Sequence, residues 1–117
     1  MVEPIMNNAQ LVESLDRNIK EAKKIVDLAE SLTRLGANRD FRRVIEDGYF
    51  EKEAVRLVHL KADPNMQSAE RQAQIVKDLD AIGSLSQFFT TIKQKASIAS
   101  KAVQADEETR AELTQEE

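Results

Sequence analysis

A chain of 117 residues with a formal net charge of −4 and no cysteine has the length of one domain and cannot form disulfides or thiolate metal sites. Its acidic balance argues against nucleic-acid binding through the whole surface. Because only three glycines and two prolines interrupt a composition rich in alanine, leucine, lysine and glutamate, we expect an all-α fold.

The first predicted element is a long helix over residues 8–35. Asn7 or Asn8 can cap it, because a short polar side chain can accept from the first free amide groups. Heptad spacing along this helix produces an apolar seam of Val12, Leu15, Ile19, Ala22, Val26 and Ala29. A second apolar stripe lies beside the seam in the later half, formed by Ile25, Leu28, Leu32 and Leu35. We expect Gly36 to end the helix, since glycine tolerates the positive φ of a helix C-terminus.

Two short helices are predicted next, over about residues 39–47 and from residue 51 to the breaker Asp63-Pro64-Asn65. Asn38 caps the first one, and its inward side is Phe41, Val44 and Ile45. The second one has an apolar side of Ala54, Val55, Leu57, Val58 and Leu60. Gly48 is expected to separate the two helices, with Tyr49 and Phe50 at the corner. These two rings either pack into the core, which we favour, or anchor a partner.

The last predicted element is a helix capped by Ser68 that runs to about Ala111. Its seam consists of Ile75, Leu79, Ile82, Leu85, Phe89, Ile92, Ala96, Ala99 and Val103. Gly83 lies inside this helix at a cost of about 1 kcal/mol relative to alanine, so it marks either a close crossing or a bend.

These elements predict two long helices that flank two short ones, in an antiparallel helical hairpin or bundle with coiled-coil character. If Leu35 meets Ile82, the antiparallel register places Leu15 beside about Ala102. The short helices and the start of the last helix then form a compact head above a two-helix stalk. The whole chain is predicted to be a single helical domain over residues 1–117, in which residues 1–7 and about 112–117 are frayed or disordered.

The last helix carries more apolar surface than one partner helix covers. Beside the seam residues Phe89, Ala99 and Val103, a second line contains Phe88, Ile98 and Ala102. We therefore expect self-association into a dimer or higher oligomer through Phe88, Ile92 and Ile98. The alternative is a compact monomer in which the helix bends at Gly83 and folds back over the head.

No catalytic or metal-binding set is recognisable in the sequence, and we expect no enzymatic activity and no cofactor. The single histidine, His59, is read as a structural or surface residue, and no apolar run approaches the ~18 residues that span a bilayer. The start of the chain, MVEPIMNN, lacks the regions of a secretory signal.

Two charged segments stand out. Arg39, Arg42 and Arg43 cluster close to Arg34, and they either form a solvated face neutralised by nearby acids or bind an acidic partner or phosphates. The second segment, residues 106–117, contains six acids and one base. It is read as a solubilising, frayed helix end, with an interaction tail as the alternative.

The stretch NRDFRRVIEDGYFEKEAVRLVHLKADP, between LAESLTRL and IVKDLDAIGSLSQFFTTI, resembles a family of small helical proteins of tailed bacteriophages. The resemblance covers roughly residues 18–105 and rests on Asp40-Phe41, Gly48-Tyr49-Phe50, residues 53–57 and residues 80–83. It implies a bacteriophage structural or assembly protein that acts through helix-mediated contacts with itself or another phage protein, in the host cytoplasm or the virion. The alternative is a small effector that inhibits a host protein or sequesters an anionic ligand. No functional residues carry over from the family.

Overall fold

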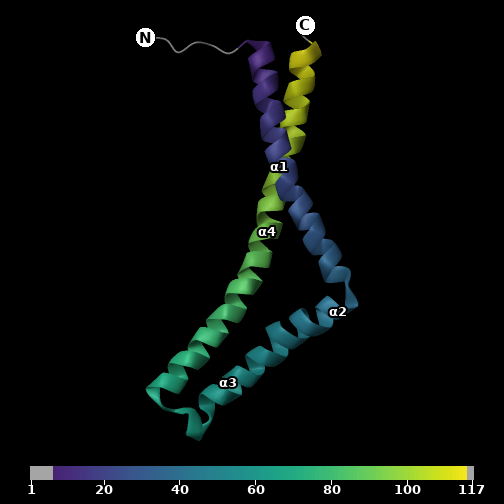
Figure 1. Cartoon of the computed structure of the whole chain (residues 1–117). Coiled ribbons are helices and arrows are strands. Elements are labelled where there is room, and N and C mark those ends of the chain that lie inside the picture. The colour runs from purple at the N-terminus through teal and green to yellow at the C-terminus, as the bar shows by residue number, and fades with distance from the viewer. Residues whose placement is uncertain (1–6, 116–117) are drawn as a thin grey trace, which may run out of the picture. The chain divides into compact units, whose positions relative to one another are not determined.

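All regular structure in residues 7–115, the part of the chain that the computed structural model describes, is helical (Figure 1). The elements are α1 (Asn8–Ala37), α2 (Arg39–Phe41), the π-helix η1 (Arg42–Glu53), α3 (Ala54–Ala62), the 3₁₀-helix η2 (Pro64–Met66) and α4 (Ala69–Gln115). The predicted all-α fold is therefore confirmed. Residues 112–115, which the sequence predicted to be frayed, belong to α4. The predictions for residues 1–6, 116 and 117 lie outside the described residues.

The chain divides into two compact units. The paired-helix unit contains the part of α1 up to Glu30 and the part of α4 from Ile92 onward. The central unit comprises residues 31–91, which include the end of α1, the segment from α2 to η2 and the beginning of α4.

In the paired-helix unit the two helices run antiparallel, side by side (Figure 1). The buried side chains belong to the predicted seams: Ile19 on α1, and Ile92, Ala96 and Ala99 on α4. Because two of these four are alanines, the helices exclude little apolar area from water, which at roughly 25 cal/mol per Å² is a modest driving force. The pairing of two seams is confirmed.

The register of this pair differs from the prediction. Arg110 Nε donates to Asp16 Oδ1 at 2.6 Å, and Lys23 Nζ lies 3.4 Å from Glu107 Oε1. Asp16 therefore lies opposite Arg110, whereas its neighbour Leu15 was predicted beside Ala102. The predicted register was wrong because it was anchored on an assumed apolar contact and ignored the charges. Those charges place the acidic end of α4 against α1, so residues 106–110 are part of the helix pair.

Side chains form hydrogen bonds with the free backbone groups at both ends of α1. At the N-terminus, Asn7 Oδ1 accepts from the Gln10 amide at 2.8 Å and Gln10 Oε1 accepts from the Asn7 amide at 3.1 Å, which is a reciprocal capping box. At the C-terminus no glycine has positive φ, so the expected role of Gly36 was wrong. Instead Asn38 adopts extended backbone, and Arg42 Nη1 donates to the carbonyl of Ala37 at 3.0 Å.

Residues 39–62 form one helical run instead of two short helices. Asn38 caps this run as predicted, since its Oδ1 accepts from the Phe41 amide at 3.0 Å. Gly48 does not end a helix: it lies in the interior of η1, with negative φ. The prediction of a break at Gly48 was wrong because the apolar residues continue through this segment, at a spacing longer than that of an α-helix.

The change of period identifies η1. In a π-helix, whose i→i+5 bonds give about 4.4 residues per turn, residues four or five apart share a face. The half-buried apolar residues of this segment follow that spacing: Phe41, Ile45, Tyr49, Phe50 and Ala54. Phe41 and Phe50, nine residues apart, would point in opposite directions on an α-helix of 3.6 residues per turn. With the π-helical turns of η1 between them, Phe41 at the end of α2 and Phe50 point the same way.

The core of the central unit is formed by Leu57 on α3 and by Ile75 and Ile82 on α4. Leu57 is 2% exposed and is the largest fully buried side chain of the described residues. Half-buried side chains pack around this core: Tyr49, Phe50, Ala54, Leu60, Met66 and Leu79. The expectation that Tyr49 and Phe50 pack into the core is confirmed. Three valines predicted to face inward are exposed instead, namely Val44, Val55 and Val58.

The turn between α3 and α4 is fixed by polar side chains. Asp63 has extended backbone before Pro64, and its Oδ1 accepts from the Asn65 amide at 2.8 Å. The Gln72 side chain donates through Nε2 to the carbonyls of Lys61 and Met66, at 3.0 and 2.7 Å, and so satisfies acceptors at the ends of α3 and η2. Ser68 Oγ accepts from the amide of residue 71 at 3.2 Å, which confirms it as the cap of α4.

Candidate contact surfaces

An aromatic cluster joins the helical run to α4 in the central unit. The Phe89 ring lies 6.0 Å from Phe41 and 5.8 Å from Phe50, measured between ring centroids, and the second contact is edge-to-face. Both contacts require the π-helical spacing, because it places Phe41 and Phe50 on one face. Such ring pairs contribute about 0.5–1.5 kcal/mol beyond their buried area.

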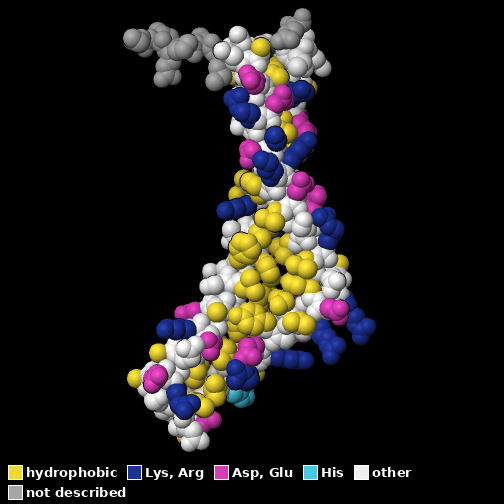
Figure 2. Space-filling view, viewed as in Figure 1, with side chains coloured by type: hydrophobic (Ala, Val, Ile, Leu, Met, Phe, Trp, Pro, Cys, Tyr) yellow, Lys and Arg dark blue, Asp and Glu magenta, His cyan; other side chains and the backbone are white. Residues whose placement is uncertain are grey.

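The outer member of this cluster is Phe88, whose ring centroid lies 6.2 Å from that of Phe89. Phe88 is 56% exposed, while Phe89 is half-buried. Figure 2 shows hydrophobic side chains gathered on the viewed face of the central unit. Two more exposed apolar residues of this unit, Leu35 and Val44, add to its accessible apolar surface. An exposed phenylalanine supported from behind by packed rings is a suitable anchor for a protein partner.

In the paired-helix unit the most exposed apolar side chain is Ile98, at 71%. Ala102, one turn further along α4, is also exposed. Ile92, which the sequence grouped with these residues as a contact for a partner, is only 8% exposed and belongs to the buried seam. A partner that approaches the folded chain therefore meets Ile98 and not Ile92.

The arginines of the cluster differ in role: some bind groups of the chain itself, and others remain accessible. Arg42 donates to the carbonyls of Gly36 and Ala37, and Arg34 Nη2 donates to Ser31 Oγ at 3.1 Å. Within the described residues, Arg39 and Arg43 are exposed, and their side chains form no hydrogen bond or ion pair. In residues 7–115 the acids expected to neutralise the cluster, Glu46, Asp47 and Glu53, form no ion pair with it, and Glu53 pairs with Arg56 instead. Arg42 thus has a structural role, and Arg39 and Arg43 are the cations that remain accessible to a ligand.

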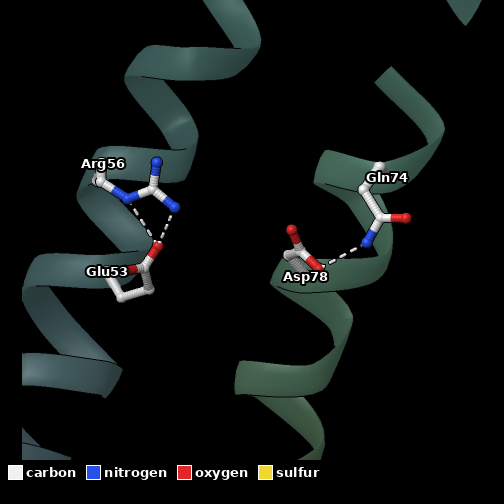
Figure 3. A network of polar contacts seen from close by, with 4 residues as sticks. All are labelled: Glu53, Arg56, Gln74 and Asp78. Atoms are coloured by element: carbon white, nitrogen blue, oxygen red, sulfur yellow. Dashed lines mark hydrogen bonds and ion pairs between the residues drawn. The ribbon is translucent and has the colours of Figure 1, made fainter. Parts of the chain in front are cut away.

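A polar network that the sequence did not predict faces across the central unit (Figure 3). Arg56 donates through Nε to Glu53 Oε1 at 2.7 Å, and on the neighbouring α4 Gln74 donates to Asp78 Oδ1 at 2.9 Å. The hydrogen bond that Arg56 donates to Glu53, and then the negative charge of Glu53, raise the pKa of Arg56, with a smaller contribution from Asp78. Arg56 is thus paired with Glu53, and Asp78 on α4 adds only a weak electrostatic attraction between the two helices.

The described residues offer few groups for catalysis or metal binding. His59 is exposed on α3, in line with its reading as a surface residue. Within residues 7–115 no group of three histidine, aspartate or glutamate side chains is arranged to hold a metal ion. None of the described helices is both long enough and apolar enough to cross a membrane.

No family model, curated protein or solved structure matches the chain. The resemblance to the phage family therefore rests on the sequence motifs alone.

Proposed function

We propose that this chain is a non-enzymatic structural or assembly protein of a bacteriophage that acts through helix-mediated contacts. The observation that carries the proposal is the exposure of large apolar side chains on well-packed helices, foremost Phe88 and Ile98. Phe88 lies beside the half-buried Phe89, whose ring it contacts, and Ile98 lies beside the buried Ala99, so both exposed side chains stand on helix faces that pack elsewhere. The phage setting comes from the sequence resemblance.

The heptad spacing of the buried seams supports coiled-coil character within the helix pair. In a protein built this way, binding energy comes from apolar helix faces that meet another helix, and specificity comes from the charges beside them.

Mass spectrometry of particles purified from the encoding phage tests this function. We expect the chain in mature particles or in assembly intermediates. Phe88→Ser or Ile98→Lys should reduce its incorporation, while the circular dichroism of the purified variants stays unchanged. Val58→Lys, at an equally exposed position of the central unit, is the control and should not alter incorporation. Absence from all particles, with the free chain present in infected lysate, would contradict the proposal.

The second candidate function is a small effector, and the observation that favours it is the pair of accessible cations at Arg39 and Arg43. An acidic partner or a phosphate-bearing ligand would bind there by charge-assisted hydrogen bonds. This function predicts binding that falls with salt and is lost in an Arg39→Glu, Arg43→Glu double variant. Isothermal titration calorimetry with inorganic phosphate and with an acidic peptide would measure it.

A further inference from the structure

An exposed stripe at heptad spacing runs along α4 on a different side from the buried seam. It is made of Lys95, Ile98, Ala102, Ala105, Thr109 and Glu112, which follow one another at intervals of three and four residues. All six are exposed, so α1 does not cover them. The stripe lies entirely within the paired-helix unit, and at 1.5 Å per residue it is about 25 Å long.

The stripe is complementary to an antiparallel copy of itself. In such a pair Lys95 lies opposite Glu112, the apolar Ile98 opposite Thr109, and Ala102 opposite Ala105. Two copies laid antiparallel would therefore place opposite charges together at both ends. Small side chains would lie at the centre, where two helix axes can approach to about 8 Å.

We propose that α4 pairs with α4 of a second copy through this stripe, antiparallel, about a twofold axis beside Val103 and Gln104. A twofold interface uses the same patch on both copies and must be self-complementary, which is the property found here. Parallel pairing is disfavoured because Lys95 would meet Lys95 and Glu112 would meet Glu112. The proposal rests on the proposed function, since it names the partner for the Ile98 surface.

The contact is modest in area, so the dimer dissociates on dilution. Ile98 contributes the largest apolar side chain, packed against Thr109 and the centre of the stripe. The charged ends mainly select the orientation and register, because exposed ion pairs contribute only about 0–1 kcal/mol each.

Size exclusion coupled to light scattering at tens of micromolar should give twice the 13.2 kDa chain mass. Lys95→Glu and Glu112→Lys should each weaken the dimer at least severalfold. The double variant should restore it, and an equimolar mixture of the two single variants should form a heterodimer. Lys93→Glu, an exposed change off the stripe, is the matched control and should leave the mass unchanged. In parallel pairing, Lys95→Glu would have no such effect.

Crosslinking determines the orientation directly, because the chain has no native cysteine. Chains with Ala102→Cys should form disulfides with Ala105→Cys chains in preference to their own kind. Preferential Ala102→Cys self-crosslinking, or a single chain mass for the unmodified protein at tens of micromolar, would overturn the proposal. A chain that is monomeric but present in phage particles would refute the dimer and leave the proposed function standing.

Discussion

Gly48 is the position at which a single methyl group tests the π-helix. A Cβ at this residue would lie 3.1 Å from the carbonyl oxygen of Arg43, which is closer than ordinary van der Waals contact. Arg43 precedes Gly48 by five residues, so its carbonyl is the acceptor position of a π-helical hydrogen bond. Gly48→Ala therefore forces the oxygen to move away from the bond that defines η1.

The magnitude follows from two opposing terms. In an ordinary helix interior, replacing glycine by alanine stabilises by about 1 kcal/mol. At Gly48 the added methyl group costs about 1–3 kcal/mol in strain, as small-to-large changes in packed sites do. We expect Gly48→Ala to range from neutral to about 2 kcal/mol destabilising.

Gly83→Ala is the matched control, because a Cβ there meets no atom within 4 Å. It lies inside α4, is exposed and has negative φ, so the change should stabilise by about 0.5–1 kcal/mol. Urea unfolding followed by circular dichroism measures both variants. If Gly48→Ala stabilises as much as Gly83→Ala, the Arg43 carbonyl is not where the π-helix places it. The segment would then be α-helical, and Phe41 and Phe50 could not both contact Phe89.

Further expectations concern the packing and capping of the central unit. Leu57→Ala should lower the free energy of unfolding by about 2–4 kcal/mol because it opens a cavity in the core, whereas Val58→Ala, at an exposed neighbour, should change it by less than about 0.5 kcal/mol in the same urea titration. Phe89→Ala should cost about 2–3 kcal/mol and reduce the near-ultraviolet circular dichroism of the aromatic cluster; an unchanged near-ultraviolet signal would show that the rings do not pack as described. Arg42→Ala should cost about 1 kcal/mol because carbonyls at the end of α1 lose their donor, and Arg39→Ala should be near neutral; equal losses by thermal denaturation would contradict the assignment of a structural role to Arg42 alone.

The sequence predicted those features that depend on one residue type at one place. Asn38 and Ser68 cap helices because a short polar side chain before a helix has few other roles, and Pro64 ends one because it lacks an amide hydrogen. Sequence reasoning failed at Gly48, where a break was predicted. The 4.4-residue spacing of Phe41, Ile45 and Phe50 is a signal for the π-helix, but apolar patterns are normally compared only with periods of 2 and 3.6.

The register and the accessible surface depend on tertiary structure, and so the sequence predicted them less well. Apolar seams with many alanines match in several registers, and the ion pairs at Arg110 and Lys23 distinguish between those registers only when the two helices are placed together. The exposure of the candidate contact residues also depends on how the two helices pack. Ile98 and Ile92 have the same chemistry, yet one is exposed and the other is buried in the pair.

The pairing of Asp16 with Arg110 joins residues 94 positions apart in the chain. During synthesis at about 5–20 residues per second, the first half of α1 waits roughly 5 to 20 s before its partner segment has been made. Throughout that interval Ile19 and its neighbours have no native helix to cover them. The closure of a loop this long also makes their pairing a late step of folding. During that interval the beginning of α1 is therefore open to chaperones, or to the wrong helix of another copy.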